Sequence, residues 1–100
     1  MLNGKWDLVV HTYMGDMTTH MTFETDGEKL TGTAEDAANG AVAPVENGVI
    51  KDGAFSYTVT IKTAVGEMTN ELSGTVDGDT LTGTSKNPMG SFDVTGQKIG

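Results

Sequence analysis

The sequence contains no cysteine, only two prolines and one tryptophan, and six basic residues against fourteen acidic ones. Without cysteine, the chain can form no disulfide framework, no thiolate zinc site and no cysteine nucleophile, so only His, Asp, Glu and Met remain as possible ligands. The formal net charge of −8 would repel phosphate backbones and anionic lipid surfaces. We therefore expect neither nucleic acid nor a membrane as a partner, and we expect the acidity to favour solubility.

Long apolar runs are also missing. No stretch approaches the roughly 20 apolar residues that span a bilayer, and the opening segment MLNGKW lacks the apolar run of a signal peptide. A chain of 100 residues has room for one modest core. The sequence thus predicts a single domain over residues 1–100, soluble and cytoplasmic.

Helical periodicity is scarce, whereas threonine is abundant and apolar residues alternate with polar ones, as in strands. Asp-Gly pairs at 26–27, 52–53 and 77–78 predict tight hairpins, because this dipeptide suits the positive φ of a type I′ turn. Further short turns are expected at 15–16 and 65–66. The sequence predicts eight strands, near residues 5–13, 17–25, 29–34, 42–50, 54–63, 68–76, 80–86 and 91–98.

The two halves of the chain are related in sequence. Residues 66–84 (GEMTNELSGTVDGDTLTGT) align without gaps onto residues 15–33 (GDMTTHMTFETDGEKLTGT) with nine identities in nineteen, at an offset of 66 − 15 = 51. The shared ending DG-x-x-LTGT is the most specific part. A repeat of half the chain length predicts two pseudo-symmetric halves, about 5–50 and 54–98.

Strand pairing through the predicted turns separates an apolar face from a polar one. With the first turn centred on residues 15–16, Leu8 faces Phe23 on the apolar side, and His11 faces His20 on the other. Consecutive hairpins with one apolar face and no helix to cover it favour closure of the sheet on itself. We therefore predict an all-β fold, an antiparallel up-and-down barrel of about eight strands, with a two-sheet β-sandwich as the alternative.

Two short motifs resemble those of known barrels. Gly4-Lys5-Trp6 at the start of the first strand, followed by Asp-Gly-x-x-Leu-Thr-Gly-Thr, resembles the opening of streptavidin-like barrels, and Gly-x-Trp is similar to the start of lipocalins. In this wider group, the calycins, the first-strand Trp packs at the closed end beneath a basic residue of the last strand. The resemblance implies this role for Lys98. Biotin binding is not predicted, because the aromatic residues that would enclose biotin are missing.

In such a barrel the three Asp-Gly turns and both termini share one end, and the remaining loops share the other. Methionines gather at that second, open end, where flexible and polarisable thioethers suit a small apolar ligand. Inward polar residues near it could orient the ligand or bind water. The predicted ligand-binding residues are Met14, Met17, Met68, Met89, Thr12, Thr19 and Asn70. Alternatively, these methionines only plug the barrel, and soft-metal binding such as Cu(I) is a weaker alternative.

The two histidines face each other in the predicted register, within reach of one shared metal ion or proton. Because His11 and His20 lie on the outer wall with only distant carboxylates, we predict no metal site and no cofactor. Val9 and Tyr13 flank His11 there. This arrangement suggests a pH-sensitive interface between barrels, and hence a homo-oligomer.

No nucleophile motif, phosphate loop or metalloprotease motif occurs. A cofactor-independent lyase or isomerase needs only one carboxylate or His beside an apolar pocket, and Asp16, Glu67, His20 and Glu46 are the candidates. Asn47-Gly48 suggests a bulge that leaves the direction of Glu46 open. The leading hypothesis is a non-enzymatic barrel that binds a small apolar molecule. The alternatives are such an enzyme and an interaction module with a filled barrel.

Overall fold

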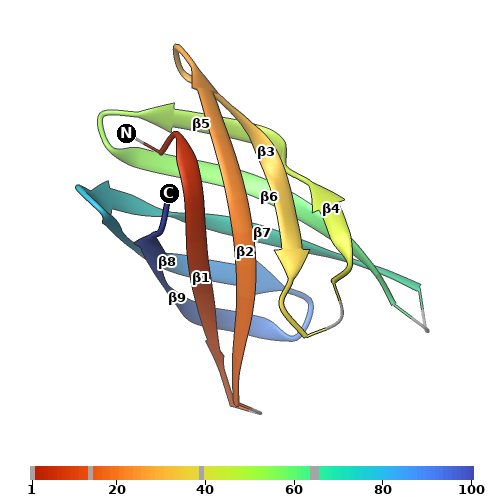
Figure 1. Cartoon of the computed structure of the whole chain (residues 1–100). Coiled ribbons are helices and arrows are strands. Elements are labelled where there is room, and N and C mark those ends of the chain that lie inside the picture. Colours follow the sequence, from red (N-terminus) through yellow and green to blue (C-terminus); the bar gives the residue numbers. More distant parts are fainter. Residues whose placement is uncertain (1, 14, 39, 64–65) are drawn as a thin grey trace.

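The computed structural model describes residues 2–13, 15–38, 40–63 and 66–100. Every regular element in these ranges is a β-strand, and none of them contains a helix that could cross a membrane. The strands follow one another as an antiparallel meander (Figure 1). Their bounds are β1 (Gly4–Thr12), β2 (Gly15–Asp26), β3 (Lys29–Asp36), β4 (Val42–Pro44), β5 (Glu46–Lys51), β6 (Ala54–Thr63), β7 (Gly66–Asp77), β8 (Thr80–Asn87) and β9 (Gly90–Lys98).

The sheet closes into a barrel. Its strand order is β2-β1-β9-β8-β7-β6-β5-β3-β4, and a further pairing of β2 with β3 joins the two ends of this order. Both β4 and β5 lie beside β3 and are separated only by the buried Val45. They are two parts of one interrupted strand. The architecture is therefore a closed eight-stranded antiparallel up-and-down barrel, which confirms the predicted fold class and excludes the sandwich.

The Asp-Gly pairs form turns of two kinds. Asp52 and Gly53 are the two loop residues between β5 and β6, and both have positive φ (52° and 81°), as a type I′ turn requires. Asp26 instead ends β2 and pairs with Lys29, so that Gly27 (φ 62°) takes the first loop position. A glycine in that place is typical of a type II′ turn. The turn centre lies one residue later than predicted there, which shifts the pairing of β2 with β3 by two residues.

The first hairpin reverses earlier than predicted. Thr12 pairs with Gly15, so His11 lies opposite Asp16, and His20 lies opposite Asp7. The predicted pairing of His11 with His20 is wrong by four residues, because Gly15 begins a strand and does not form the turn. Since side chains alternate with a period of two, a slip of two or four residues keeps every side chain on its face. For this reason the predicted inward and outward faces agree with the structure although the predicted partners do not.

Fifteen of the described residues are apolar, buried and packed together inside the barrel. Glycines in the strand interiors let neighbouring strands approach one another around this core: a Cβ on Gly74 would lie 2.1 Å from the carbonyl oxygen of Thr82. Aromatic residues lie opposite glycines in the ladders, as Phe23 does with Gly32. The core consists of Leu2, Trp6, Leu8, Met21, Phe23, Leu30, Ala34, Val45, Ile50, Phe55, Tyr57, Val59, Leu72, Leu81 and Val94.

The end of the barrel that carries the Asp-Gly turns is sealed. Both chain termini lie at this end (Figure 1). Leu2 and Trp6 have no exposed surface, and the Trp6 indole donates a hydrogen bond to the Leu2 carbonyl. Lys98 is directly opposite Trp6 in the ladder between β1 and β9. We call this the closed end and the opposite one the open end.

Candidate functional site

Inward-facing side chains are fully buried at the closed end and partly exposed at the open end. Trp6, Phe23 and Leu30 are at most 1% exposed, whereas Val10 is half-buried and Met17 is 53% exposed. Among the described residues, the exposure of inward-facing side chains therefore increases toward one end of the barrel. We call that end of the inner wall the Met-rich mouth. Its inward-facing residues are Val10, Thr12, Met17, Thr19, Ile61, Met68, Asn70, Asn87 and Phe92.

The predicted methionines reach this mouth from three hairpins. Met17 pairs with Val10 across β1 and β2, and the half-buried Met68 pairs with Ile61 across β6 and β7. Met89 lies in the turn between β8 and β9 and is 59% exposed. The fourth predicted methionine, Met14, lies outside the described residues. Two thioethers thus come from inward-facing positions and a third lies at the rim.

The predicted polar residues lie on the same inner wall. Asn70 is buried, and its Oδ1 accepts a hydrogen bond of 2.9 Å from Nδ2 of Asn87, whose own Oδ1 accepts one from the Met89 backbone N–H. This chain of hydrogen bonds fixes the Asn70 amide and ties the rim turn to the inner wall. Thr12 donates to the Gly15 carbonyl, and Thr19, which pairs with Leu8 further from the rim, is half-buried. Of the three predicted polar residues, Asn70 is the most enclosed.

Apolar side chains are exposed at the rim of the mouth. The rings of Tyr13 and Phe92 lie 5.7 Å apart between centroids, linking the β1–β2 hairpin to β9. Tyr13, Val42 and Met89 are each more than half exposed at this end. Exposed apolar groups that are concentrated in one area mark surfaces that bind other molecules more often than isolated ones do.

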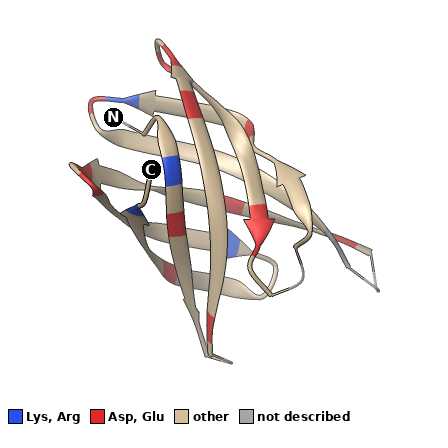
Figure 2. Ribbon diagram, viewed as in Figure 1, with Lys and Arg blue, Asp and Glu red and all other residues tan. Residues whose placement is uncertain are grey.

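Acidic residues lie at both ends of the barrel (Figure 2). At the closed end, Asp26, Glu28, Asp52 and Asp77 lie near the lysines at positions 5, 29, 51 and 98. Asp16, Glu35, Glu67 and Asp93 lie on the strands that border the open end, together with Lys86. An acidic border of this kind repels anions and attracts cations over a distance that salt limits. Anionic ligands are therefore disfavoured at the mouth.

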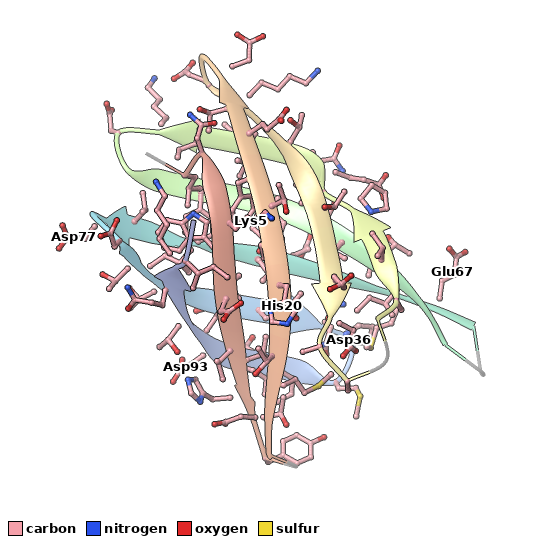
Figure 3. All side chains as sticks on the ribbon, viewed as in Figure 1. Lys5, His20, Asp36, Glu67, Asp77 and Asp93 are labelled. Carbon is pink, nitrogen blue, oxygen red and sulfur yellow. The ribbon has the colours of Figure 1, made fainter. Side chains whose placement is uncertain are left out.

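The four candidate catalytic residues lie on the outside of the barrel, as Figure 3 shows for His20 and Glu67. The side chains of Asp16 and His20 are 62% and 46% exposed. Glu67 is exposed at the start of β7, and Glu46 is exposed beside a bulge at which Asn47 has a φ of 52°. The structure confirms the bulge that the sequence suggested. A catalytic role for these four residues in the lumen gains no support from this placement.

Each histidine instead pairs with a carboxylate of the neighbouring strand. His11 Nδ1 lies 3.0 Å from Asp16 Oδ1, and its Nε2 lies 3.0 Å from Thr95 Oγ1, so that one imidazole bridges β2, β1 and β9. His20 Nδ1 lies 2.6 Å from Asp7 Oδ1. No group of three metal-binding side chains occurs within the described ranges. The shared histidine pair that suggested a pH-sensitive interface does not form, and homo-oligomerisation stays a prediction.

One functional candidate, Tyr57 on β6, was not predicted from the sequence. It is 2% exposed, and its ring lies 5.5 Å from that of Phe23 and 6.0 Å from that of Phe55. Its hydroxyl oxygen is buried and has no hydrogen-bond partner in the described part of the chain. Burial raises the pKa of Tyr57 well above its usual value, so the hydroxyl is a proton donor at neutral pH. The available signal was a tyrosine between Phe55 and Val59 on an apolar inward face.

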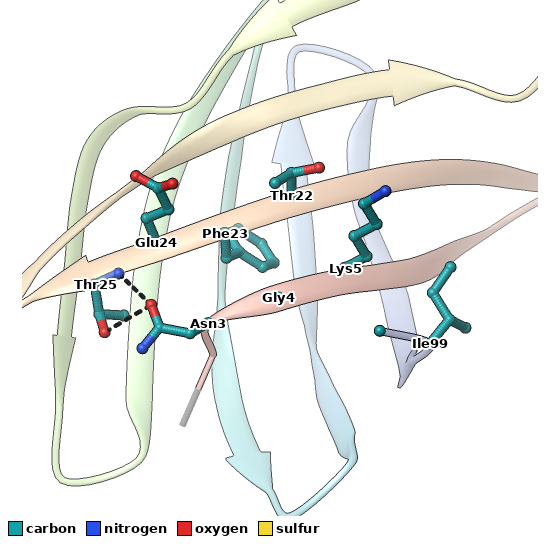
Figure 4. A pocket seen from close by; sticks show the side chains of 9 residues that line it. Asn3, Gly4, Lys5, Thr22, Phe23, Glu24, Thr25 and Ile99 are labelled. Carbon is teal, nitrogen blue, oxygen red and sulfur yellow. Dashed lines mark hydrogen bonds between the residues drawn. The ribbon is translucent and has the colours of Figure 1, made fainter.

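Two surface depressions lie at the closed end. The larger is lined by Lys5, Thr22 and Glu24 on the outer wall beside the termini (Figure 4). There Asn3 Oδ1 accepts hydrogen bonds from the backbone N–H and the hydroxyl of Thr25, which fastens the segment before β1 to β2. The smaller lies between the first two Asp-Gly turns. Neither includes any of the predicted ligand-binding residues.

Comparison with known proteins supports the architecture. No protein-family profile and no curated protein matches the chain. A solved structure of a redesigned β-barrel is similar, with a TM-score of 0.75 and 15% sequence identity over 99% of this chain and 91% of that one. At this identity the similarity shows a shared fold alone. The chain therefore has the fold of a closed β-barrel, and its function must be argued from its own residues.

Proposed function

We propose that the barrel binds a small, mostly apolar molecule through the Met-rich mouth. The observation that carries the proposal is the gradient of exposure along the inward faces, from fully buried at the closed end to half-buried or exposed at the open end. Small-molecule sites are concave and mainly apolar, with a few well-placed polar groups. The mouth combines apolar side chains with one fixed amide, that of Asn70.

The chemistry of the lining supports a ligand held by shape and dispersion. Val10 and Ile61 provide stiff apolar surface, while the thioethers of Met17 and Met68 can adapt to different outlines. The resemblance of the first-strand and LTGT motifs to streptavidin-like and calycin barrels also supports the proposal, because eight-stranded barrels of those groups hold one small ligand in the lumen. The acidic border favours an uncharged or cationic molecule over an anion.

The test is a titration with the uncharged fluorescent probe N-phenyl-1-naphthylamine, whose emission increases in apolar surroundings. We expect saturable binding at one site per chain. Met68→Glu places a charge on the inner wall and should weaken binding at least about tenfold, because a buried charge without a partner is costly.

Thr69→Glu is the matched control, since Thr69 is adjacent to Met68 and exposed on the outer face. It should bind the probe like the wild type. Emission of the buried Trp6 reports whether each variant is folded. If the folded wild type shows no saturable binding, the proposal fails and the filled interaction module is the better description. If Met68→Glu binds the probe as tightly as the wild type does, the binding site does not lie at the mouth.

A further inference from the structure

We infer that the Tyr57 hydroxyl is the polar anchor of the lumen ligand, and that this ligand is an uncharged apolar molecule with a hydrogen-bond acceptor such as a ketone, ester or amide carbonyl. The inference rests on the proposed function and adds the ligand class to it. It assigns the selection of ligands with a hydrogen-bond acceptor to Tyr57, which lies inside the barrel and further from the open end than the mouth residues.

The unsatisfied hydroxyl is the first step. Buried side-chain polar atoms in folded proteins almost always have a hydrogen-bond partner, and an exception requires an explanation. Within the described residues, the Tyr57 hydroxyl is the one buried side-chain group that has none. The missing partner is therefore a molecule other than the protein.

The surroundings of Tyr57 explain why the chain itself provides no partner. Its ring contacts Phe23 and Phe55, and Leu72 lies directly across the ladder from it. The nearest inward polar residue along that ladder is Asn70, which pairs with Val59, two residues closer to the open end. The side-chain oxygen Oδ1 of Asn70 already accepts a hydrogen bond from Nδ2 of Asn87. On the next strand the buried Ser85 pairs with Leu72, at the level of Tyr57, so polar groups line the inner wall both at this depth and, at Asn70, nearer the open end.

The chemistry of a phenol in this place selects the ligand class. A protonated phenol donates one hydrogen bond and can also accept one; an acceptor satisfies the O–H that the protein leaves without a partner. A carboxylate or phosphate would lose its hydration on entering and would have to pass the acidic border of the open end. An ammonium group has no lone pair to accept the bond. A neutral carbonyl meets all three conditions.

Benzophenone and diphenylmethane form a suitable probe pair, because they share two phenyl rings and differ only in a carbonyl against a methylene. Both are titrated into the wild type, Tyr57→Phe and Tyr13→Phe by calorimetry. Tyr13 is the only other tyrosine and is 72% exposed, so its variant is the matched control. We expect the wild type to prefer benzophenone, and Tyr57→Phe to lose this preference through a weakening of ketone binding by about tenfold, with diphenylmethane unaffected.

Infrared spectroscopy gives a readout that needs no variant. The carbonyl stretch of benzophenone bound to the wild type should lie at a lower frequency than in hexane, since hydrogen bonding weakens the C=O bond. In the complex with Tyr57→Phe, the stretch should return toward the hexane value, and Tyr13→Phe should leave it shifted.

The outcomes separate the two proposals. If both probes bind the wild type without preference and the carbonyl stretch matches that in hexane, the anchor is refuted while the binding function stands. That result would mean that the Tyr57 hydroxyl is hydrogen-bonded to a trapped water molecule. If neither probe binds and N-phenyl-1-naphthylamine does not bind either, the binding function is refuted together with the anchor. Binding of the naphthylamine alone refutes only the carbonyl class.

Discussion

The indole Nε1 of Trp6 donates a hydrogen bond of 3.0 Å to the carbonyl oxygen of Leu2, and neither residue has any exposed surface. The segment before β1 therefore folds across the barrel end, and its backbone satisfies the one polar atom of the largest core side chain. Because the termini and the Asp-Gly turns share this sealed end, the proposed ligand site lies at the other end, the Met-rich mouth.

Removal of the Leu2 side chain should destabilise the whole barrel. Leu2→Ala deletes a fully buried side chain, and such changes cost about 2–5 kcal/mol in the free energy of unfolding, depending on how far the site collapses. The measurement is urea unfolding followed by Trp6 fluorescence, with a red shift of native emission as a second sign. Ile99→Ala, at a residue that is 57% exposed beside the same end, should change stability by less than about 0.5 kcal/mol. Equal effects of the two variants would show that Leu2 does not seal the barrel.

Removal of the Tyr57 hydroxyl should stabilise the ligand-free protein. Tyr57→Phe keeps the ring contacts with Phe23 and Phe55 and eliminates a buried donor that has no protein partner, a group whose burial costs about 1–3 kcal/mol. We expect a higher urea midpoint at an unchanged slope, and no significant change for Tyr13→Phe. A destabilised Tyr57→Phe would mean that the hydroxyl is already hydrogen-bonded in solution, for example to water.

The register of the first hairpin can be tested with engineered disulfides, since the chain has no cysteine of its own. Asp7 and His20 are direct partners, so Asp7→Cys with His20→Cys should oxidise to an intramolecular disulfide. His11 lies four residues from Asp7 along β1, about 13 Å away at the rise of a strand, which is beyond disulfide reach. The combination of His11→Cys with His20→Cys should therefore stay reduced. Non-reducing electrophoresis and mass spectrometry distinguish the two results, and the reverse pattern would contradict the register.

A methyl group on an interior glycine should be far more harmful than a side chain on a turn glycine. In Gly74→Ala the new Cβ would meet the Thr82 carbonyl oxygen at 2.1 Å, so β7 and β8 would have to separate. We expect a loss of more than about 2 kcal/mol or failure to fold. Gly27→Asn is the comparison, because Gly27 has open space around it and only its φ of 62°, which Asn adopts more readily than most residues, opposes the change. Thermal unfolding of both proteins measures the difference, and equal midpoints would argue against close strand contact at Gly74.

Alternation of apolar and polar residues was sufficient to predict the strands, their inward faces and the closed barrel. Leu8, Phe23 and Val59 lie on the inner face whichever turn is assumed, because a slip of an even number of residues changes the partner and leaves the face unchanged. The Asp-Gly pairs also located the hairpins correctly, since an error of one residue in the turn centre shifts the partners by two residues and keeps the hairpin. These features are local, and the chain encodes them within a few residues.

The exact partners depended on turn geometry that the dipeptides do not specify. The same Asp-Gly pair occupies both loop positions at 52–53, whereas at 26–27 its Asp is a strand residue that pairs with Lys29. In the same way, whether His11 meets His20 or Asp16 depends on where the first hairpin reverses, and the structure begins β2 at Gly15.

Sequence alone thus determined an acidic, cysteine-free, all-β chain with one apolar face, because composition and period-two patterning act residue by residue. Only the tertiary structure decided that Leu2 covers Trp6, that His11 meets Asp16 and that the Tyr57 hydroxyl has no partner in the described part of the chain. Each of these depends on contacts or spaces between groups that the folded barrel brings together, and no local pattern records them.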